Sequence, residues 1–423
     1  MRKLTSFLFV ALAFSIFGCK GPEGPTGPGG TNGTNGTNAF WQIDGMKDSL
    51  QCGKCHSADY DTTYRVAARK IQYETSGHLE NGDYDRYTTT CGGCHTNEGF
   101  NERYRNGFAS ETYTPGVASG PIIHQDYPQS SPVGCFSCHA PHLRGNFSLR
   151  DSSASVINTL IANVTPKTWN TSASANLCVK CHQPRMTSTP LIPSSSTPAS
   201  WQPNPTKTAT TDTAKIYTTR WNNHTSGEVV QTLLGFGGVE FAGYTYSNSY
   251  HNTLVTTKAI GCEDCHMATP IGNKGGGHTF KIGYIPEGST TESFNFAGCN
   301  ASGCHSGSAI TATSAKWAGV RNEIIAKTAK LANYCLDTTR TKKWTVPKSG
   351  KTVQWVSFTI SGADTTWSVA NASGTSPLQI VPAYKAGVLW NLQQAMYENS
   401  KGIHNTAYIR SLLDASIAEM EKP

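Results

Sequence analysis

The hydrophobic pattern of the chain changes near Ser306, and regular elements are predicted mainly beyond it. Apolar positions recur at intervals of three and four residues, which is typical of an amphipathic helix. They are Trp317, Val320, Ile324, Thr328, Leu331 and Cys335. This places Cys335 on the buried stripe as an inert core residue, and a regulatory or crosslinking thiol is the alternative.

A small β-hairpin and two more helices are predicted after this stripe. Strand-like residues occur at 353–360 and 367–369 around a turn at 362–364. Pro382 then opens a helix with apolar positions through Met396, and a second helix runs from Tyr408 to Met420. His404 lies in the break between these helices. From there we expect it to reach toward the preceding part of the chain.

The N-terminal residues 1–18 have the pattern of an export signal. Arg2 and Lys3 precede a largely apolar run at 7–17, which is too short to span a bilayer as a mature helix. The following Cys19 stands where bacterial lipoproteins carry a diacylated cysteine. The alternative is an ordinary cleaved signal with Cys19 as a bystander.

Residues 19–38 form a collagen-like segment with glycine at every third position from Gly21. Six triplets are too few for a stable triple helix, so a solvated tether is expected. Extended at about 3.1 Å per residue, it would reach roughly 55 Å from a membrane.

The remaining 385 residues, 39–423, have too little apolar material for a conventional core. Only 37% of the whole chain is apolar, so something other than side chains is expected to fill the interior. Residues 187–212 are rich in Ser, Thr and Pro and predict a surface excursion. Gly235-Phe236-Gly237-Gly238 lacks the lysine of a nucleotide loop, which favours a turn or a close backbone approach.

The cysteines are the most informative residues in the chain. Five pairs have the spacing Cys-x-x-Cys and are each followed by histidine: Cys52/Cys55-His56, Cys91/Cys94-His95, Cys135/Cys138-His139, Cys178/Cys181-His182 and Cys262/Cys265-His266. A sixth group, Cys299/Cys304-His305, has four residues between its cysteines. Of the 14 cysteines, only Cys19 and Cys335 remain outside these groups.

This order of residues is that of covalent haem attachment. Two thiols add to the two vinyl groups of one porphyrin, and the next histidine becomes the proximal iron ligand. Histidine is only 13 of 423 residues. Five successive histidines after chance cysteine pairs would have a probability on the order of 10⁻⁸, which makes zinc and disulfide interpretations improbable.

The sixth group requires a bulge to bring both sulfurs to the vinyl spacing. Gly303 and the small Ala301 and Ser302 permit one. We therefore expect a sixth haem here, and a disulfide beside a stray His305 is the alternative.

Seven further histidines nearly match the six distal ligands that six haems require. They are His78, His124, His142, His224, His251, His278 and His404. Coordination by two histidines closes both faces of an iron, which favours electron transfer over catalysis. One of His142 or His224 is expected to be surplus and to donate a hydrogen bond to an iron-binding residue instead of binding an iron itself.

Three of these histidines precede an attachment motif at short range. His124 and His251 each lie eleven residues before the first cysteine of a motif, and His78 lies thirteen before. This degenerate repeat is far shorter than a separate domain and predicts haems stacked in close pairs.

These residues also resemble ligand motifs of bacterial multihaem cytochromes, from about Cys52 to Ile417. The similar segments are Thr75-Ser76-Gly77-His78, the stretch 135–142, Gly277-His278-Thr279-Phe280 and Lys401-Gly402-Ile403-His404-Asn405. The resemblance implies chains of haems that meet edge to edge, with bis-histidine irons. At 221–224 similar cytochromes often have two adjacent histidines, and Asn223 replaces the first.

The charge of +7 does not indicate nucleic-acid binding, because no cluster of Lys and Arg stands out. It falls to +5 without Arg2 and Lys3, and twelve haem propionates would take it to −7. The excess of Lys and Arg over Asp and Glu is thus expected to neutralise the propionates of the haems.

We therefore expect a mostly irregular and helical multihaem cytochrome fold, organised around stacked haems, with few short strands. A haem-binding domain at 39–310 would carry six covalent haems c, and a helical region at 311–423 with the hairpin would supply a distal histidine. The expected function is electron transfer with redox protein partners, on the bacterial cell envelope and anchored through Cys19. The alternatives are a reductase of a small nitrogen or sulfur oxyanion with one open iron, and a subunit of a haem filament.

Overall fold

The computed structural model describes most of the chain beyond Tyr64. The described residues are 65–80, 82–106, 123–140, 147–184, 203–217, 219, 221, 224, 227–347, 353–361, 364–370, 372 and 376–423. The expected signal, Cys19 and the tether lie outside them. So do the first attachment motif, Cys52/Cys55-His56, and the candidate ligand His142.

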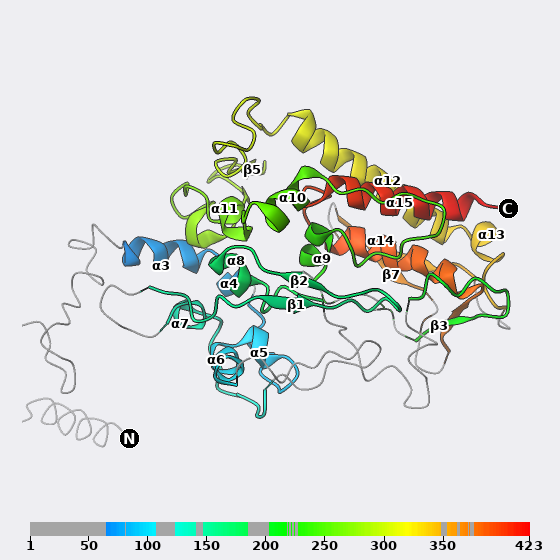
Figure 1. The fold of residues 1–423 in the computed structure, drawn as a ribbon, viewed down its shortest axis with the longest axis horizontal. Coiled ribbons are helices and arrows are strands. Elements are labelled where there is room, and N and C mark those ends of the chain that lie inside the picture. The colour runs from blue at the N-terminus through cyan, green and yellow to red at the C-terminus, as the bar shows by residue number, and fades with distance from the viewer. Residues whose placement is uncertain are drawn as a thin grey trace, which may run out of the picture. The chain divides into compact units, whose positions relative to one another are not determined.

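Short helices carry most of the attachment motifs (Figure 1). The helices before residue 310 are α3 (Val66–Glu74), α4 (Gly77–Glu80), α5 (Gly92–His95), α6 (Asn97–Arg105), α7 (Cys135–Cys138), α8 (Ala173–Cys178), α9 (Glu228–Leu234), α10 (Tyr250–Thr257), α11 (Cys262–His266) and the 3₁₀ turn η2 (Gly277–Thr279). Four of them begin or end within a motif. Glycine and small polar residues separate them, which keeps each helix to one or two turns.

The strands form four separate two-stranded antiparallel sheets among the described residues. Their members are β1 (Ser155–Ile157) with β2 (Lys167–Trp169), β3 (Ala214–Ile216) with β8 (Leu378–Ile380), β4 (Gly283–Tyr284) with β5 (Ser293–Phe294), and β6 (Val356–Ser361) with β7 (Asp364–Val369). The β6–β7 pair lies where the sequence predicted a hairpin. Pairing of β3 with β8 ties the segment near residue 215 to the C-terminal region.

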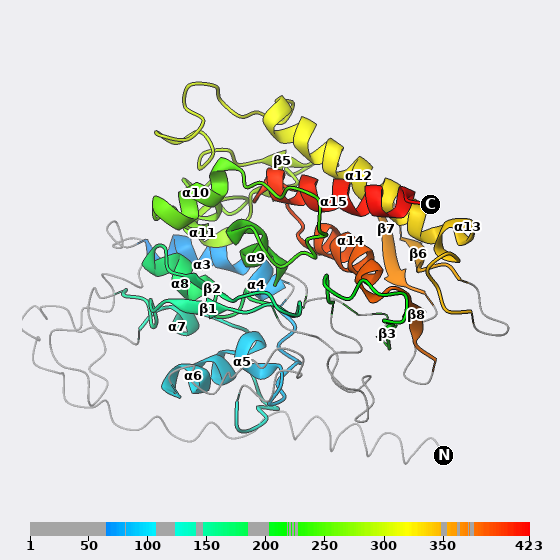
Figure 2. The ribbon, with the colours of Figure 1, turned by 45° about the vertical axis from the view of Figure 1, so that its right-hand side comes forward.

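Three long helices dominate the C-terminal part of the chain (Figures 1 and 2). They are α12 (Val320–Leu336), α14 (Gly387–Tyr397) and α15 (Thr406–Glu421), accompanied by the π-helical turn η3 (Ala315–Gly319), the 3₁₀ turn η4 (Ala383–Ala386) and α13 (Thr338–Thr341). Both views place α12 and α15 side by side, and α14 contacts both helices. Cys335 is fully buried on α12, as its position in the apolar stripe predicted.

The main hydrophobic core joins these helices to segments that come much earlier in the chain. Leu331, Leu389 and Leu412 share one buried cluster with Leu160 and Trp221. Burying each such side chain contributes roughly 1.5–3 kcal/mol. Residues on both sides of position 311 thus belong to one core, within the unit Cys55–Pro423.

The glycine-rich stretch at 235–238 docks α9 onto the C-terminal helices. Gly235 ends α9 with φ 63°, a left-handed conformation that glycine adopts without strain. The indole N–H of Trp390 donates to the Gly237 carbonyl (2.8 Å), and the Gly238 N–H donates to the hydroxyl of Tyr408 (3.1 Å). The stretch is therefore a turn with a close backbone approach to helices. Of the helices that the structure describes, none is both long and apolar enough to cross a membrane.

Candidate haem-binding site

The attachment motifs share one backbone hydrogen bond. In three Cys-x-x-Cys-His motifs the histidine N–H donates to the carbonyl of the first cysteine: His95 to Cys91 (3.2 Å), His139 to Cys135 (2.8 Å) and His182 to Cys178 (3.0 Å). This is the bond of one helical turn, and it places both sulfurs and the imidazole close together in space.

The longer sixth motif makes the same bond despite its extra residues. The N–H of His305 donates to the carbonyl of Cys299 at 3.0 Å. The two additional residues are absorbed by a turn in which Gly303 has φ 83°. Cys299 and Cys304 do not form a disulfide, and neither do the other cysteines within the described ranges. The disulfide alternative is therefore not the state seen in this structure.

Five motif histidines each lie beside one histidine from outside the motifs. The pairs and the separations of their ring centroids are His78 with His182 (6.0 Å), His95 with His224 (5.8 Å), His139 with His278 (6.3 Å), His251 with His305 (6.2 Å) and His266 with His404 (6.2 Å). In every pair one ring follows an attachment motif and the other is a distal candidate.

These separations fit one iron between two imidazoles. Bonds of about 2 Å from a metal to two nitrogens on opposite sides put the ring centroids about 6 Å apart. Rings in direct stacking contact would be closer. Among the described residues, no three or more His, Cys, Asp or Glu side chains form a group that could hold a bare metal ion. The donors come as pairs beside two thiols, which is the set that a covalent haem requires.

Backbone carbonyls orient several of these rings. The Nδ1 of His139 lies 2.8 Å from the Phe147 carbonyl, that of His266 lies 3.0 Å from the Phe280 carbonyl, and that of His251 lies 2.7 Å from the Ile403 carbonyl. A carbonyl only accepts, so Nδ1 carries the proton in each case. In the neutral ring this leaves the lone pair on Nε2, which is the nitrogen that would bind an iron.

Burial keeps most of these rings neutral. Burial, followed by the charges of His78 and His266, lowers the pKa of His182 to about 4. Burial, with Arg69 and His139 nearby, lowers the pKa of His278 to about 4. Burial also lowers the pKa of His78, His95, His266 and His305. A neutral imidazole is the form that binds a metal.

His404 is held by a carboxylate instead of a carbonyl. Its Nδ1 is hydrogen-bonded to Glu398. The Glu398 side chain is fully buried, and it also accepts from the Ser400 hydroxyl (2.5 Å) and the Gly402 N–H (3.1 Å). A histidine whose other nitrogen donates to a carboxylate is a stronger metal ligand. No sequence motif pointed to Glu398.

Three of the motifs lie in contact with a neighbouring motif. The thiols of Cys178 and Cys262 lie close enough to affect each other, since their interaction lowers the pKa of Cys178 and raises that of Cys262, which joins the fourth motif to the fifth. The Arg103 guanidinium lies 3.1 Å from the Cys94 sulfur and 3.8 Å from the Cys181 sulfur, which joins the second motif to the fourth. The fourth motif is therefore the centre of the group.

His124 is placed differently from the five paired candidates. Its side chain is 72% exposed, and no other described histidine ring lies beside it. Glu102 accepts from its backbone N–H (2.6 Å) and lies 2.8 Å from its Nδ1. Since His224 lies beside His95, His124 and His142 are the candidates left for the first motif.

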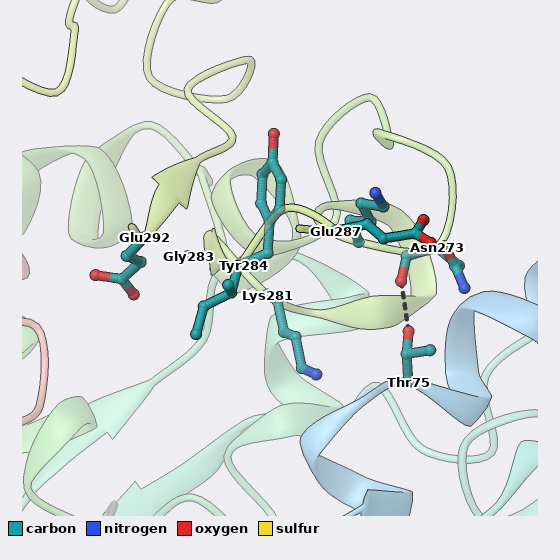
Figure 3. Close-up of a pocket in the computed structure, with 9 residues that line it drawn as sticks. Thr75, Asn273, Lys281, Gly283, Tyr284, Glu287 and Glu292 are labelled. Atoms are coloured by element: carbon teal, nitrogen blue, oxygen red, sulfur yellow. Dashed lines mark hydrogen bonds between the residues drawn. The ribbon is translucent and has the colours of Figure 1, made fainter. Parts of the chain in front are cut away.

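A separate open pocket of about 520 Å³ lies between the end of α3 and the strand β4 (Figure 3). Its lining is a mixture of polar and apolar side chains that includes Thr75, Lys281, Tyr284, Ile285 and Glu287, and no cysteine or histidine is among the described residues that line it. The Thr75 hydroxyl donates to the Asn273 carbonyl across one side (2.5 Å). The pocket is thus distinct from the group of motifs.

Comparison of the chain with protein family models, with curated proteins and with solved structures gave no match. The assignment of this site depends on the residues and on their geometry.

Proposed function

We propose that this chain is a c-type cytochrome that carries six covalent haems and relays electrons. The observation that carries the proposal is the pairing of five motif histidines with five other histidines at ring separations near 6 Å. Haem attached in this way supplies a reversible one-electron couple at each iron.

The residues of the chain have three tasks in this function. The cysteine thiols bind the porphyrin edges and fix the position of each group. The five histidine pairs would each hold one iron through two imidazoles and leave no open position there for a substrate. Burial of rings such as those of His182 and His278 keeps each ring neutral at neutral pH, so that one of its two nitrogens is unprotonated.

Close contact between motifs favours transfer within the chain. The links from Cys94 through Arg103 to Cys181, and from Cys178 to Cys262, put three attachment sites side by side. Five closed pairs favour a relay over the reductase alternative, which requires an iron without a distal ligand. The remaining site, that of the first motif with His56, is where that alternative and the filament alternative are to be tested.

The proposal includes export and anchoring. Residues 1–18 would direct export, and a diacylated Cys19 with the tether at 21–38 would hold the protein on the bacterial cell envelope, facing the periplasm or the outer surface. Redox proteins, or an acceptor outside the cell, would be its partners. Replacing Cys19 with serine should release the cytochrome in soluble form, and unchanged fractionation would contradict the anchor.

The proposed function is tested by counting haems and their ligands. Intact mass after acid extraction of loose cofactor should exceed the processed polypeptide by six haem masses. Electron paramagnetic resonance of the oxidised protein should contain low-spin signals alone. As a matched control, the double variant Cys262→Ser with Cys265→Ser should carry five haems. A high-spin signal in the unaltered protein, together with turnover of nitrite or a sulfur oxyanion, would replace the relay with the enzyme.

A further inference from the structure

Arg103 lies between two attachment motifs that are far apart in sequence. It belongs to α6, and its side chain is almost completely buried, with 1% exposure. One guanidinium nitrogen, Nη1, donates to the Gly93 carbonyl (3.1 Å) and lies 3.1 Å from the Cys94 sulfur. The other, Nη2, donates to the Lys180 carbonyl (2.8 Å). Gly93 and Lys180 are both internal residues of Cys-x-x-Cys motifs.

The local fold explains how the side chain reaches this position. The N-cap of α6 is Thr96, the residue directly after His95, and its hydroxyl accepts from the Gly99 N–H at 3.0 Å. The helix therefore starts at the second motif and turns back across it. Arg103 faces the motif two turns later, whereas Arg105 on the same helix is exposed.

The burial of the permanent charge of Arg103 beside two motifs indicates that this side chain has a specific role. Removing a cation from water costs several kcal/mol unless compensating contacts are made. The planar guanidinium reaches both motifs with its two terminal nitrogens. A lysine ammonium, which is a single compact charge, is less suited to bridge them. A fixed cation in the interior is also poorly screened by salt, so its field acts on nearby groups.

We propose that Arg103 is a shared positioning residue of the second and fourth haem sites, and that its cation raises the reduction potentials of both haems. The inference depends on the proposed function. Reduction adds an electron to each iron, and a positive charge beside both porphyrin edges favours that state. The two hydrogen-bonded carbonyls fix the separation of the motifs, so both sites respond to one residue.

The test is a redox titration of the full holoprotein, followed by visible and electron paramagnetic resonance spectroscopy. Arg103→Gln removes the charge, and two of the six midpoint potentials should shift downward. Arg103→Lys keeps the positive charge but lacks the two-armed guanidinium, and these two potentials should stay near their original values. Arg105→Gln makes the same charge change on the exposed side of α6 and should shift none of them.

Histidine variants identify which haems respond. His224→Ala and His78→Ala should each convert one iron to high-spin, and the potential of that marked iron should fall when Arg103→Gln is added. Unchanged potentials in Arg103→Gln with six haems attached, or an equal shift of all six, would overturn the inference. If Arg103→Gln loses haem, the result of Arg103→Lys is used instead. Midpoint potentials of the second and fourth haems that are retained in Arg103→Lys support the role of the charge, and lowered potentials contradict it. A haem count or spin state that differs from the proposal in the unaltered protein would instead refute the proposed function.

Discussion

The imidazole ring of His404 lies 6.2 Å from that of His266, although 138 residues separate them in the chain. His404 stands between α14 and α15, and His266 ends α11. The pair therefore connects the C-terminal helices to the fifth attachment motif. It also gives the most direct test of closed iron coordination.

Replacing His404 with alanine should open one iron without releasing its haem. The thioether bonds of Cys262 and Cys265 do not involve His404, so the haem count should stay at six. One iron should become high-spin and bind carbon monoxide, which the unaltered protein should not do. Absorption and electron paramagnetic resonance spectra measure both effects. Asp414→Ala, an exposed change on the neighbouring α15, serves as the control.

Replacing Glu398 with glutamine should change the potential of the same haem but not its spin state. The Glu398 carboxylate accepts from Nδ1 of His404 and makes this ring more electron-donating. An amide is a weaker acceptor without charge, so the oxidised iron loses stabilisation and the potential should rise. Spectroelectrochemistry would detect the shift. A high-spin iron in this variant would mean that Glu398 is needed to hold the ligand in place.

Replacing Glu228 with glutamine should flatten the dependence of stability on pH. Burial, and then the charge of Glu398, raise the pKa of Glu228 to about 8, and neither Glu228 oxygen has a hydrogen-bond partner among the described residues. The folded state thus binds this proton more tightly than the unfolded chain. Its stabilising effect is complete below the ordinary pKa of 4.5 and is lost as pH rises through about 8.

Denaturant unfolding between pH 4 and pH 9 would measure this effect, which is on the order of a few kcal/mol for a buried carboxyl group. The variant should lose less stability than the unaltered protein as pH rises. The matched change Glu287→Gln, at an exposed position, should keep the original slope. Equal slopes for all three proteins would contradict the assignment of the buried proton to Glu228.

Of His124 and His142, one is expected to bind the iron of the first motif. The sequence suggested that either His142 or His224 would be the surplus histidine. Because His224 lies beside His95, the surplus histidine is instead either His124 or His142. Single alanine variants should give one high-spin iron for the true ligand and none for the other. Two low-spin variants would mean that His56 has a ligand from elsewhere, including a neighbouring subunit.

The sequence by itself determined the six groups of cysteines and histidine on which the proposed haem attachment rests. Haem attachment needs two thiols and a histidine within one or two turns of backbone, so its signature is local and can be read directly. The regular elements after residue 315 were also predictable, because α12, α14 and α15 have strong apolar periodicity. The hairpin at β6 and β7 followed from strand-like residues around a glycine turn.

Only the tertiary structure decided which histidines meet. His251 precedes the fifth motif by eleven residues but lies beside His305 of the sixth, and His78 precedes the second motif but lies beside His182 of the fourth. Short-range spacing therefore did not indicate the partner. No sequence pattern indicated Arg103 or Glu398. Arg103 contacts a motif that is distant in the chain, and Glu398 contacts His404 only because a turn brings the two side chains together. The pairing of the histidines and the placement of charged side chains beside the motifs depend on long-range packing, which a local pattern does not encode.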